Sequence, residues 1–245
     1  MLSILSQGAA ELGLDLTPQQ LDLFERYAGL LLTSGRQAGV TSIDRPEEIE
    51  RRHLLESLVV AAALLRDGLL DRLAETAVLD LGSGGGLPGL PIKVLLPHIK
   101  LTLLDAGARK AAFLHQAVAA IHLDGVEIVT ARAEDAGRQP AYREQFDLVL
   151  ARAVAPLPVL LELALPFLRV GGHLAAPKGS RALAELAAGR RALETLGGAV
   201  VSAEPLQAPG SKYHQRLLLI EKTGPTPAHY PRKAGIPQKR PLTTK

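Results

Sequence analysis

The first 75 residues place apolar side chains at the three- and four-residue spacing of amphipathic helices. Thr17 and Pro18 begin one helix, because threonine is a favoured N-cap and proline fits the first helical turn. The apolar face of this helix consists of Leu21, Phe24, Tyr27, Leu30 and Leu31. A second helix is predicted from about residue 46 to residue 65. Residues 1–75 are therefore predicted to form an N-terminal helical region.

From residue 76 the pattern changes to short apolar runs that alternate with helix-length segments. This alternation is typical of an α/β fold with a parallel sheet. The expected strands are residues 77–81, 100–104, 126–129, 146–150 and 172–176. The clearest helices between them are residues 108–121 and 180–196.

The end of this region differs, because residues 200–204 and 216–221 are apolar runs with only a loop between them. Two strands that lie so close in the sequence pair antiparallel. Residues 76–222 are therefore predicted to form a mostly parallel sheet that ends in an antiparallel hairpin. Residues 223–245 contain five prolines, which predict an extended tail.

Composition restricts the class of protein. The chain of 245 residues is 47% hydrophobic and 22% charged, as globular proteins are, and it has no cysteine. Disulfides, thiolate metal sites and a cysteine nucleophile are thereby excluded. The longest apolar run, residues 58–65, is far shorter than the roughly 20 residues of a membrane span, and the N-terminus lacks a basic signal-like start. We expect a cytoplasmic protein with no membrane contact and no metal.

Charge is distributed unevenly along the chain. The net charge is +3, but residues 222–245 carry six basic residues and no acid, which leaves 22 basic against 25 acidic residues elsewhere. Such asymmetry favours a polyanionic partner, and a tail that only aids solubility is the alternative. In one interpretation, the tail is an extended arm that contacts a polyanion. In the rival interpretation, Tyr230 and Ile236 hold the tail against the protein, so that it is part of the fold.

A glycine-rich loop follows the first expected strand. Gly84, Gly86 and Gly89 fit the pattern G-x-G-x-x-G, in which glycines allow a tight turn and a close approach of backbone to ligand. Four glycines in five positions exceed what a plain turn requires, so a nucleotide-like ligand is favoured.

The residues around this loop discriminate between two such ligands. A dinucleotide needs backbone donors at the start of the helix, where Pro88 and Pro91 remove two of them. Asp80 precedes the loop and suits a cationic group, such as the amino group and sulfonium of S-adenosylmethionine. Asp105 ends the second strand, where an acid binds ribose hydroxyls of either ligand. The terminal hairpin is typical of class I S-adenosylmethionine-dependent methyltransferases, with their Rossmann-like sheet.

Seven motifs along the chain carry a resemblance to a known family. They are Arg52-His-Leu-Leu-Glu-Ser-Leu58, the loop from Asp80 to Pro91, Leu104-Asp-Ala with Lys110 and Phe113-Leu114, Ala131-Arg-Ala-Glu-Asp135, Ala151-Arg-Ala-Val-Ala-Pro156, Pro177-Lys-Gly179 and the tail from Tyr230 to Pro237. The chain thereby resembles the RsmG (GidB) family, which methylates N7 of a guanine in 16S ribosomal RNA.

The resemblance implies roles for individual residues. Those implied to contact the cofactor or shape its loop are Gly82, Gly84, Leu87, Asp105, Ala133, Glu134 and Arg152. Asp105 is implied to bind the ribose, and Ala133 and Glu134 to lie beside the adenine. Lys178, at the end of the fifth strand, is expected to contact the guanine or a flanking phosphate as the catalytic candidate, with a helix-entry cation as the alternative. His53, on an apolar helix face, is interpreted as a hydrogen-bonded core residue.

The implied chemistry needs no general base, because N7 of guanine carries a free lone pair. Lys178 has no matching acid partner in the sequence, which argues against a base set for O-methylation. The expected cofactor is S-adenosylmethionine, and the expected partner is ribosomal RNA in the small subunit. We expect a monomer, although nothing in the sequence fixes the oligomeric state. Alternatives are a small-molecule methyltransferase, a non-catalytic RNA-binding assembly factor and, more weakly, a dehydrogenase.

Overall fold

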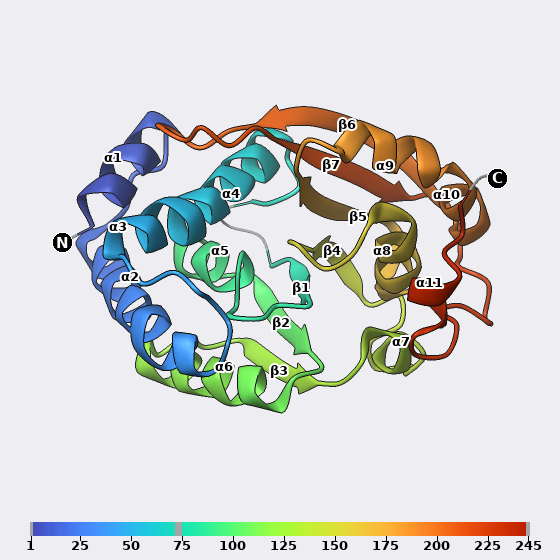
Figure 1. Ribbon diagram of the computed structural model, residues 1–245, viewed down its shortest axis with the longest axis horizontal. Helices are drawn as coiled ribbons and strands as arrows, with labels where there is room; N and C mark the ends of the chain where they lie inside the picture. The colour runs from blue at the N-terminus through green and yellow to red at the C-terminus, as the bar shows by residue number, and fades with distance from the viewer. Residues whose placement is uncertain (1, 72–74, 244–245) are drawn as a thin grey trace.

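A computed structural model describes residues 2–71 and 75–243. They fold around one seven-stranded sheet with the order β3-β2-β1-β4-β5-β7-β6 (Figure 1). The strands are β1 Ala77–Leu81, β2 Lys100–Asp105, β3 Val126–Thr130, β4 Phe146–Leu150, β5 Leu168–Lys178, β6 Gly198–Leu206 and β7 Gln215–Lys222. Strand β7 pairs antiparallel with both β5 and β6, whereas the other pairings are parallel. The predicted sheet and its terminal hairpin are confirmed.

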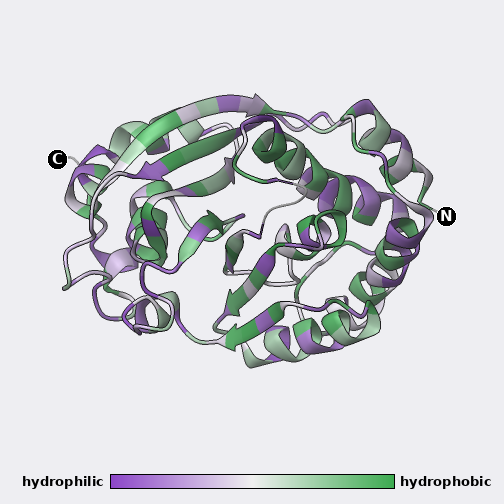
Figure 2. Cartoon of the chain, turned by 180° about the vertical axis from the view of Figure 1, so that it is seen from behind, coloured by the Kyte–Doolittle hydropathy of each residue, from purple (hydrophilic) through white to green (hydrophobic). Residues whose placement is uncertain are grey.

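The central strands are apolar because both of their faces are covered. Successive residues of β1 alternate between the two faces, so that Val78 belongs to one hydrophobic cluster while Leu79 and Leu81 belong to the other. The same alternation separates Leu217 and Leu219 from Leu218 and Ile220 in β7. Figure 2 shows the hydrophobic colour along the central strands and on parts of the helices around them.

Helices of the N-terminal region and of the first two crossovers cover one face of the sheet (Figure 1). They are α1 Ser3–Glu11, α2 Pro18–Leu30, α3 Pro46–Ile49, α4 Glu56–Arg66, α5 Gly89–Leu95 and α6 Ala108–Ala120. Two π-helical segments, η1 Leu31–Gly35 and η2 Glu50–Leu55, extend α2 and join α3 to α4. Thr17 caps α2 in a capping box with Gln20, as the sequence predicts. Residues 72–74, next to the predicted boundary, lie outside the described residues.

The other face carries α7 Ala133–Ala136, α8 Leu157–Ala164, η3 Leu165–Phe167, α9 Ala182–Ala188 and α10 Arg190–Leu196. The single helix predicted over residues 180–196 is wrong, because Gly189 separates α9 from α10. Gly189 is buried, and a Cβ there would lie 3.3 Å from Leu161 and 3.4 Å from Leu157. Glycine thus lets the chain pass close to α8, and its low helix propensity favours a break there.

The C-terminal tail, residues 223–243, folds back onto this second face and contains the short helix α11 Ile236–Lys239. Tyr230 and Leu242 are buried in the hydrophobic cluster. The Arg232 guanidinium pairs with Glu162 at 2.6 Å, and Glu162 is fully buried on α8. The prediction of an extended arm is therefore wrong for the described residues, and the rival interpretation, a tail held against the protein, is confirmed.

Candidate active site

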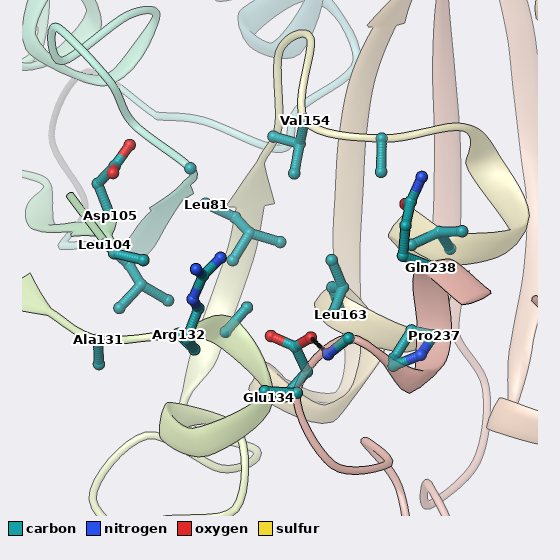
Figure 3. Close-up of a pocket in the computed structure, with 17 residues that line it drawn as sticks. Leu81, Leu104, Asp105, Ala131, Arg132, Glu134, Val154, Leu163, Pro237 and Gln238 are labelled. Carbon is teal, nitrogen blue, oxygen red and sulfur yellow. Dashed lines mark hydrogen bonds between the residues drawn. The ribbon is translucent and has the colours of Figure 1, made fainter. Parts of the chain in front are cut away.

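The carboxyl ends of β1 and β2, together with the segments that follow β3 and β4, border a cavity of about 570 Å³, which we call the first cavity. It lies where the strand order reverses between β1 and β4, the position at which open α/β sheets bind ligands. Its size suits a small-molecule ligand. The lining residues include Gly82, Asp105, Ala133 and Glu134, together with apolar side chains such as Leu163 (Figure 3).

The glycine loop is fixed to the neighbouring strand by its backbone. The amides of Gly82 and Ser83 both donate to the Leu104 carbonyl, at 2.8 and 3.0 Å. Gly82 has φ +67°, and a Cβ there would lie 2.9 Å from a methyl group of Val154. Tyr27 of α2 donates its hydroxyl hydrogen bond to the Gly85 carbonyl. The loop therefore presents backbone to the cavity at a position that has no room for a side chain.

Asp105 is held by two backbone donors at the end of β2. Its Oδ2 accepts from the Gly84 amide at 3.0 Å, and its Oδ1 accepts from the Gly107 amide at 2.8 Å. Lys110 lies 3.4 Å from Oδ2. A carboxylate fixed in this way retains lone pairs for a hydroxyl donor in the cavity, so Asp105 fits the predicted ribose contact.

Asp80 differs from its predicted role, because it is fully buried and does not line the first cavity. Its Oδ2 accepts from the Gly89 amide at 2.8 Å, at the start of α5. An acid therefore occupies the helix N-terminus where a dinucleotide would place its pyrophosphate. Burial raises the pKa of Asp80 to about 7. Its Oδ1 and the Ser83 hydroxyl are buried without a hydrogen-bond partner among the described residues, which leaves polar capacity beside the loop.

A second cavity, of about 720 Å³, lies on the other side of the loop between β4 and α8. Val154 and Ala155 line both cavities. The second cavity is lined by charged and polar side chains, including Arg52, His53, Glu56, Arg152, Lys178, Arg181 and Glu185. The two cavities thus share one wall made by a single loop.

Lys178 lies in the second cavity, with its side chain only 10% exposed. Its ammonium donates to the Ala155 carbonyl and lies 2.9 Å from Glu185. Glu185 also accepts from the Leu157 amide at 2.8 Å. The expectation that Lys178 has no acid partner is wrong, because α9 brings Glu185 to the end of β5.

Arg152 also lies in the second cavity rather than the first. Its guanidinium donates to the Arg52 carbonyl at 3.1 Å and lies 3.4 Å from His53 Nδ1 and 3.7 Å from Glu56. Gly84 and the buried Leu87 do not line the first cavity either. Of the predicted cofactor residues, Gly82, Asp105, Ala133 and Glu134 meet in one cavity, and Gly84, Leu87 and Arg152 do not line it.

His53 makes the hydrogen bond that the sequence suggested, because its Nε2 lies 2.8 Å from the Thr41 hydroxyl. It also lines the second cavity, which sequence reasoning missed. Burial, followed by the neighbouring Arg152 charge, lowers the pKa of His53 to about 4. The imidazole is therefore neutral at pH 7, and Thr41 and Arg152 set its orientation.

Four tail residues were also missed: Ala234, Gly235, Pro237 and Gln238 line the first cavity. The Gly235 amide donates to Glu134 Oε1 at 2.9 Å. The tail motif from Tyr230 to Pro237 was a visible signal, but its position in space was not.

The sheet order and the cavity beyond β1 define the Rossmann-like fold of class I S-adenosylmethionine-dependent methyltransferases. The crystal structure of a SAM-dependent methyltransferase from Aquifex aeolicus has a TM-score of 0.54 at 17% identity, and the match covers 75% of this chain and 97% of that chain.

The particular family follows from sequence comparison. Residues 20–217 match the GidB family, rRNA small subunit methyltransferase G. The ribosomal RNA small subunit methyltransferase G of Roseiflexus castenholzii is 45% identical, covering 96% of this chain and 97% of the relative. That of Moorella thermoacetica is 41% identical over 98% of this chain and 97% of the relative. The chain belongs to this family.

Two further observations concern the described residues alone. No helix within residues 2–71 and 75–243 combines the length and hydropathy that a membrane crossing requires. Over the same residues, no three potential metal ligands of the His, Cys, Asp and Glu types are grouped around a common point.

Proposed function

We propose that this protein transfers a methyl group from S-adenosylmethionine to N7 of a guanine in 16S ribosomal RNA, in the cytoplasm where small subunits are found. The observation that carries the proposal is the wall shared by the two cavities. Val154 and Ala155 line both of them, so a cofactor in the first cavity and a base in the second meet at one loop. Membership of the rRNA small subunit methyltransferase G family supports this assignment.

The residues of the first cavity fit the cofactor. Asp105 has lone pairs for the ribose hydroxyls, and Glu134 accepts hydrogen bonds as the adenine amine requires. Gly82 lets the backbone approach the ligand. When bound, S-adenosylmethionine supplies an electrophilic methyl group on a sulfonium.

The residues of the second cavity orient the base rather than remove a proton. Guanine N7 has a free lone pair, so the acceptor needs no deprotonation before it attacks. His53 is neutral and engaged with Thr41, and Lys178 is engaged with Ala155 and Glu185. In our proposal, Lys178 donates to the guanine or to a flanking phosphate, and alignment of the acceptor with the methyl group supplies most of the rate enhancement.

The surface around the second cavity suits RNA. Arg52, Arg152 and Arg181 line it together with Lys178, and such cations neutralise backbone phosphates. Tyr213 is 55% exposed, and the Arg52 guanidinium lies 5.1 Å from its ring centroid. An exposed ring beside cations is a stacking platform for an unpaired base.

The test is to incubate the protein with purified small subunits and S-adenosylmethionine carrying a labelled methyl group, and then to map the labelled nucleotide. We expect one guanine to be labelled, and chain cleavage specific for 7-methylguanine to occur at that nucleotide. A matched reaction with Asp105→Ala should label the same guanine at a reduced rate. Label on a pyrimidine or on an exocyclic amine would contradict the proposed acceptor.

A further inference from the structure

The first cavity receives part of its lining from the far end of the chain. Ala234, Gly235, Pro237 and Gln238 line it together with the ends of β1 and β2, the segment after β3 and the β4–α8 loop. In Figure 3, Pro237 and Gln238 lie across the cavity from Asp105, and the dashed line joins Glu134 to the tail. This side of the cavity is therefore lined by the tail and not by the glycine loop or the strand ends.

We propose that residues 232–238 form a wall of the S-adenosylmethionine site, and that docking of the tail and binding of the cofactor stabilise each other. The inference rests on the proposed function, which assigns the first cavity to the cofactor. In this inference the tail contacts the cofactor rather than RNA, although the tail is rich in basic residues.

Arg232 anchors the segment next to the cavity. Its Nε and terminal nitrogen donate to Glu162 at 2.8 and 2.6 Å, and its backbone amide donates to the same carboxylate at 2.9 Å. Glu162 is fully buried, and the next residue of α8, Leu163, lines the cavity. A paired charge in a buried setting holds both partners in one geometry, so the start of the wall is fixed.

Gly235 connects the wall to a predicted cofactor residue. Its φ of +80° belongs to the left-handed region that glycine adopts readily, and its amide donates to Glu134 Oε1 at 2.9 Å. No described residue donates a hydrogen bond to Oε2 of the same carboxylate. The tail therefore fixes the rotamer of Glu134 and leaves one oxygen for a donor in the cavity.

The chemistry of the wall suits the nucleoside end of the cofactor. Ala234 and Pro237 offer apolar contact to a flat heterocycle, and Gln238 carries an amide that donates and accepts. Glu134 lies on the same side and accepts hydrogen bonds, as an exocyclic amine requires. The basic side chains of Lys233 and Lys239 are exposed and do not line the cavity.

The test uses the full-length protein and S-adenosylhomocysteine as the probe, with affinity measured by calorimetry. Gly235→Pro removes the amide donor and cannot adopt φ +80°, while Arg232 and its anchor remain. We expect affinity to fall at least about tenfold, with the melting temperature of the unliganded protein nearly unchanged. The double variant Lys233→Ala, Lys239→Ala is the matched control and should bind the probe as the unaltered protein does.

A second measurement covers the case in which Gly235→Pro melts early. Hydrogen exchange of the amides of residues 232–236, 238 and 239 in the unaltered protein should slow when S-adenosylhomocysteine is added. Unchanged exchange, or unchanged affinity in Gly235→Pro, overturns the inference.

Asp105→Ala separates this failure from failure of the proposed function. If Asp105→Ala weakens probe binding and Gly235→Pro does not, the cofactor site stands and the role of the tail is wrong. If neither variant weakens binding, the assignment of the first cavity to the cofactor is wrong.

Discussion

The two cavities on either side of the β4–α8 loop differ in the partners of their charged side chains. In the first, the carboxylates of Asp105 and Glu134 are held by backbone amides, and most other lining is apolar. In the second, Lys178 pairs with Glu185, and Arg152 lies near Glu56. The amides that hold the carboxylates of the first cavity are fixed in the backbone, whereas the cations of the second cavity are side chains that can pair with a phosphate. The first cavity is thus preorganised for one ligand, and the second is suited to a polyanion.

Among variants that affect the first cavity, Gly82→Val is expected to have the largest effect on cofactor affinity. A side chain there meets Val154 at 2.9 Å and must also adopt φ +67°, a strain of about 1–3 kcal/mol for such a residue. We expect affinity for S-adenosylmethionine to fall about a hundredfold or more, measured by calorimetry. Gly171→Val is the matched control, because Gly171 has φ +85° with no atom within 4 Å of its Cβ position. Equal losses in both variants would show that strain alone is responsible.

Asp105→Ala should have the next largest effect. It leaves ribose hydroxyls and two backbone amides without their acceptor, which costs about 1–3 kcal/mol, or roughly 5- to 150-fold in affinity. Asp147→Ala is the control, because Asp147 accepts from the Ala77 amide at the opposite edge of the sheet. That variant should lower the melting temperature and keep cofactor affinity. If Asp105→Ala changes stability but not affinity, Asp105 has a structural role only.

Lys178→Ala should affect the second cavity alone. Loss of one charged hydrogen bond to the RNA predicts a fall in kcat/KM for small subunits of about tenfold, with cofactor affinity unchanged. Lys100→Ala removes an exposed ion pair with Glu75 and should leave both quantities as they are. A loss of cofactor affinity in Lys178→Ala would mean that the two cavities are not independent.

The smallest expected effect is a pH dependence of stability from His53. Its pKa is about 4 in the folded protein and 6.5 in the unfolded chain, so the unfolded chain binds more protons between these values. Stability from this group is complete above pH 6.5 and is lost as the pH falls towards 4, by on the order of 1 kcal/mol. Denaturation curves of the unaltered protein and of His53→Gln should diverge as the pH is lowered. Parallel curves would show that His53 titrates normally.

Local features of the chain were predictable, and contacts between distant residues were not. Both ends of strand β1 were predicted, because its apolar residues are interrupted only by Asp80 and the strand is bounded by Thr76 and Gly82. Strand β5 begins at Leu168, four residues before the predicted start, because its pairing with β4 has an irregular register that includes Arg169 and glycines.

In the candidate site, too, local motifs were predictable and contacts between distant residues were not. The glycine loop and Asp105 were found because the motif is local and its spacing is fixed by two adjacent strands. The residues that pair with the tail, and those that meet in the second cavity, were not found, because they lie far apart in the sequence. Arg232 and Glu162 are 70 residues apart, and Arg152 and His53 are 99 apart. Glu162 lies within an apolar helix, and nothing in the sequence indicates which cation neutralises it.

The tail also has a consequence for the order in which the site is assembled. The lining of the first cavity runs from Leu81 to Gln238, so synthesis must pass almost the whole described chain before the last wall exists. Tyr27, which supports the glycine loop, is made long before that loop. A nascent chain can thus form strands β1 to β4 and the glycine loop early, yet the first cavity stays open on one side until Arg232 reaches Glu162.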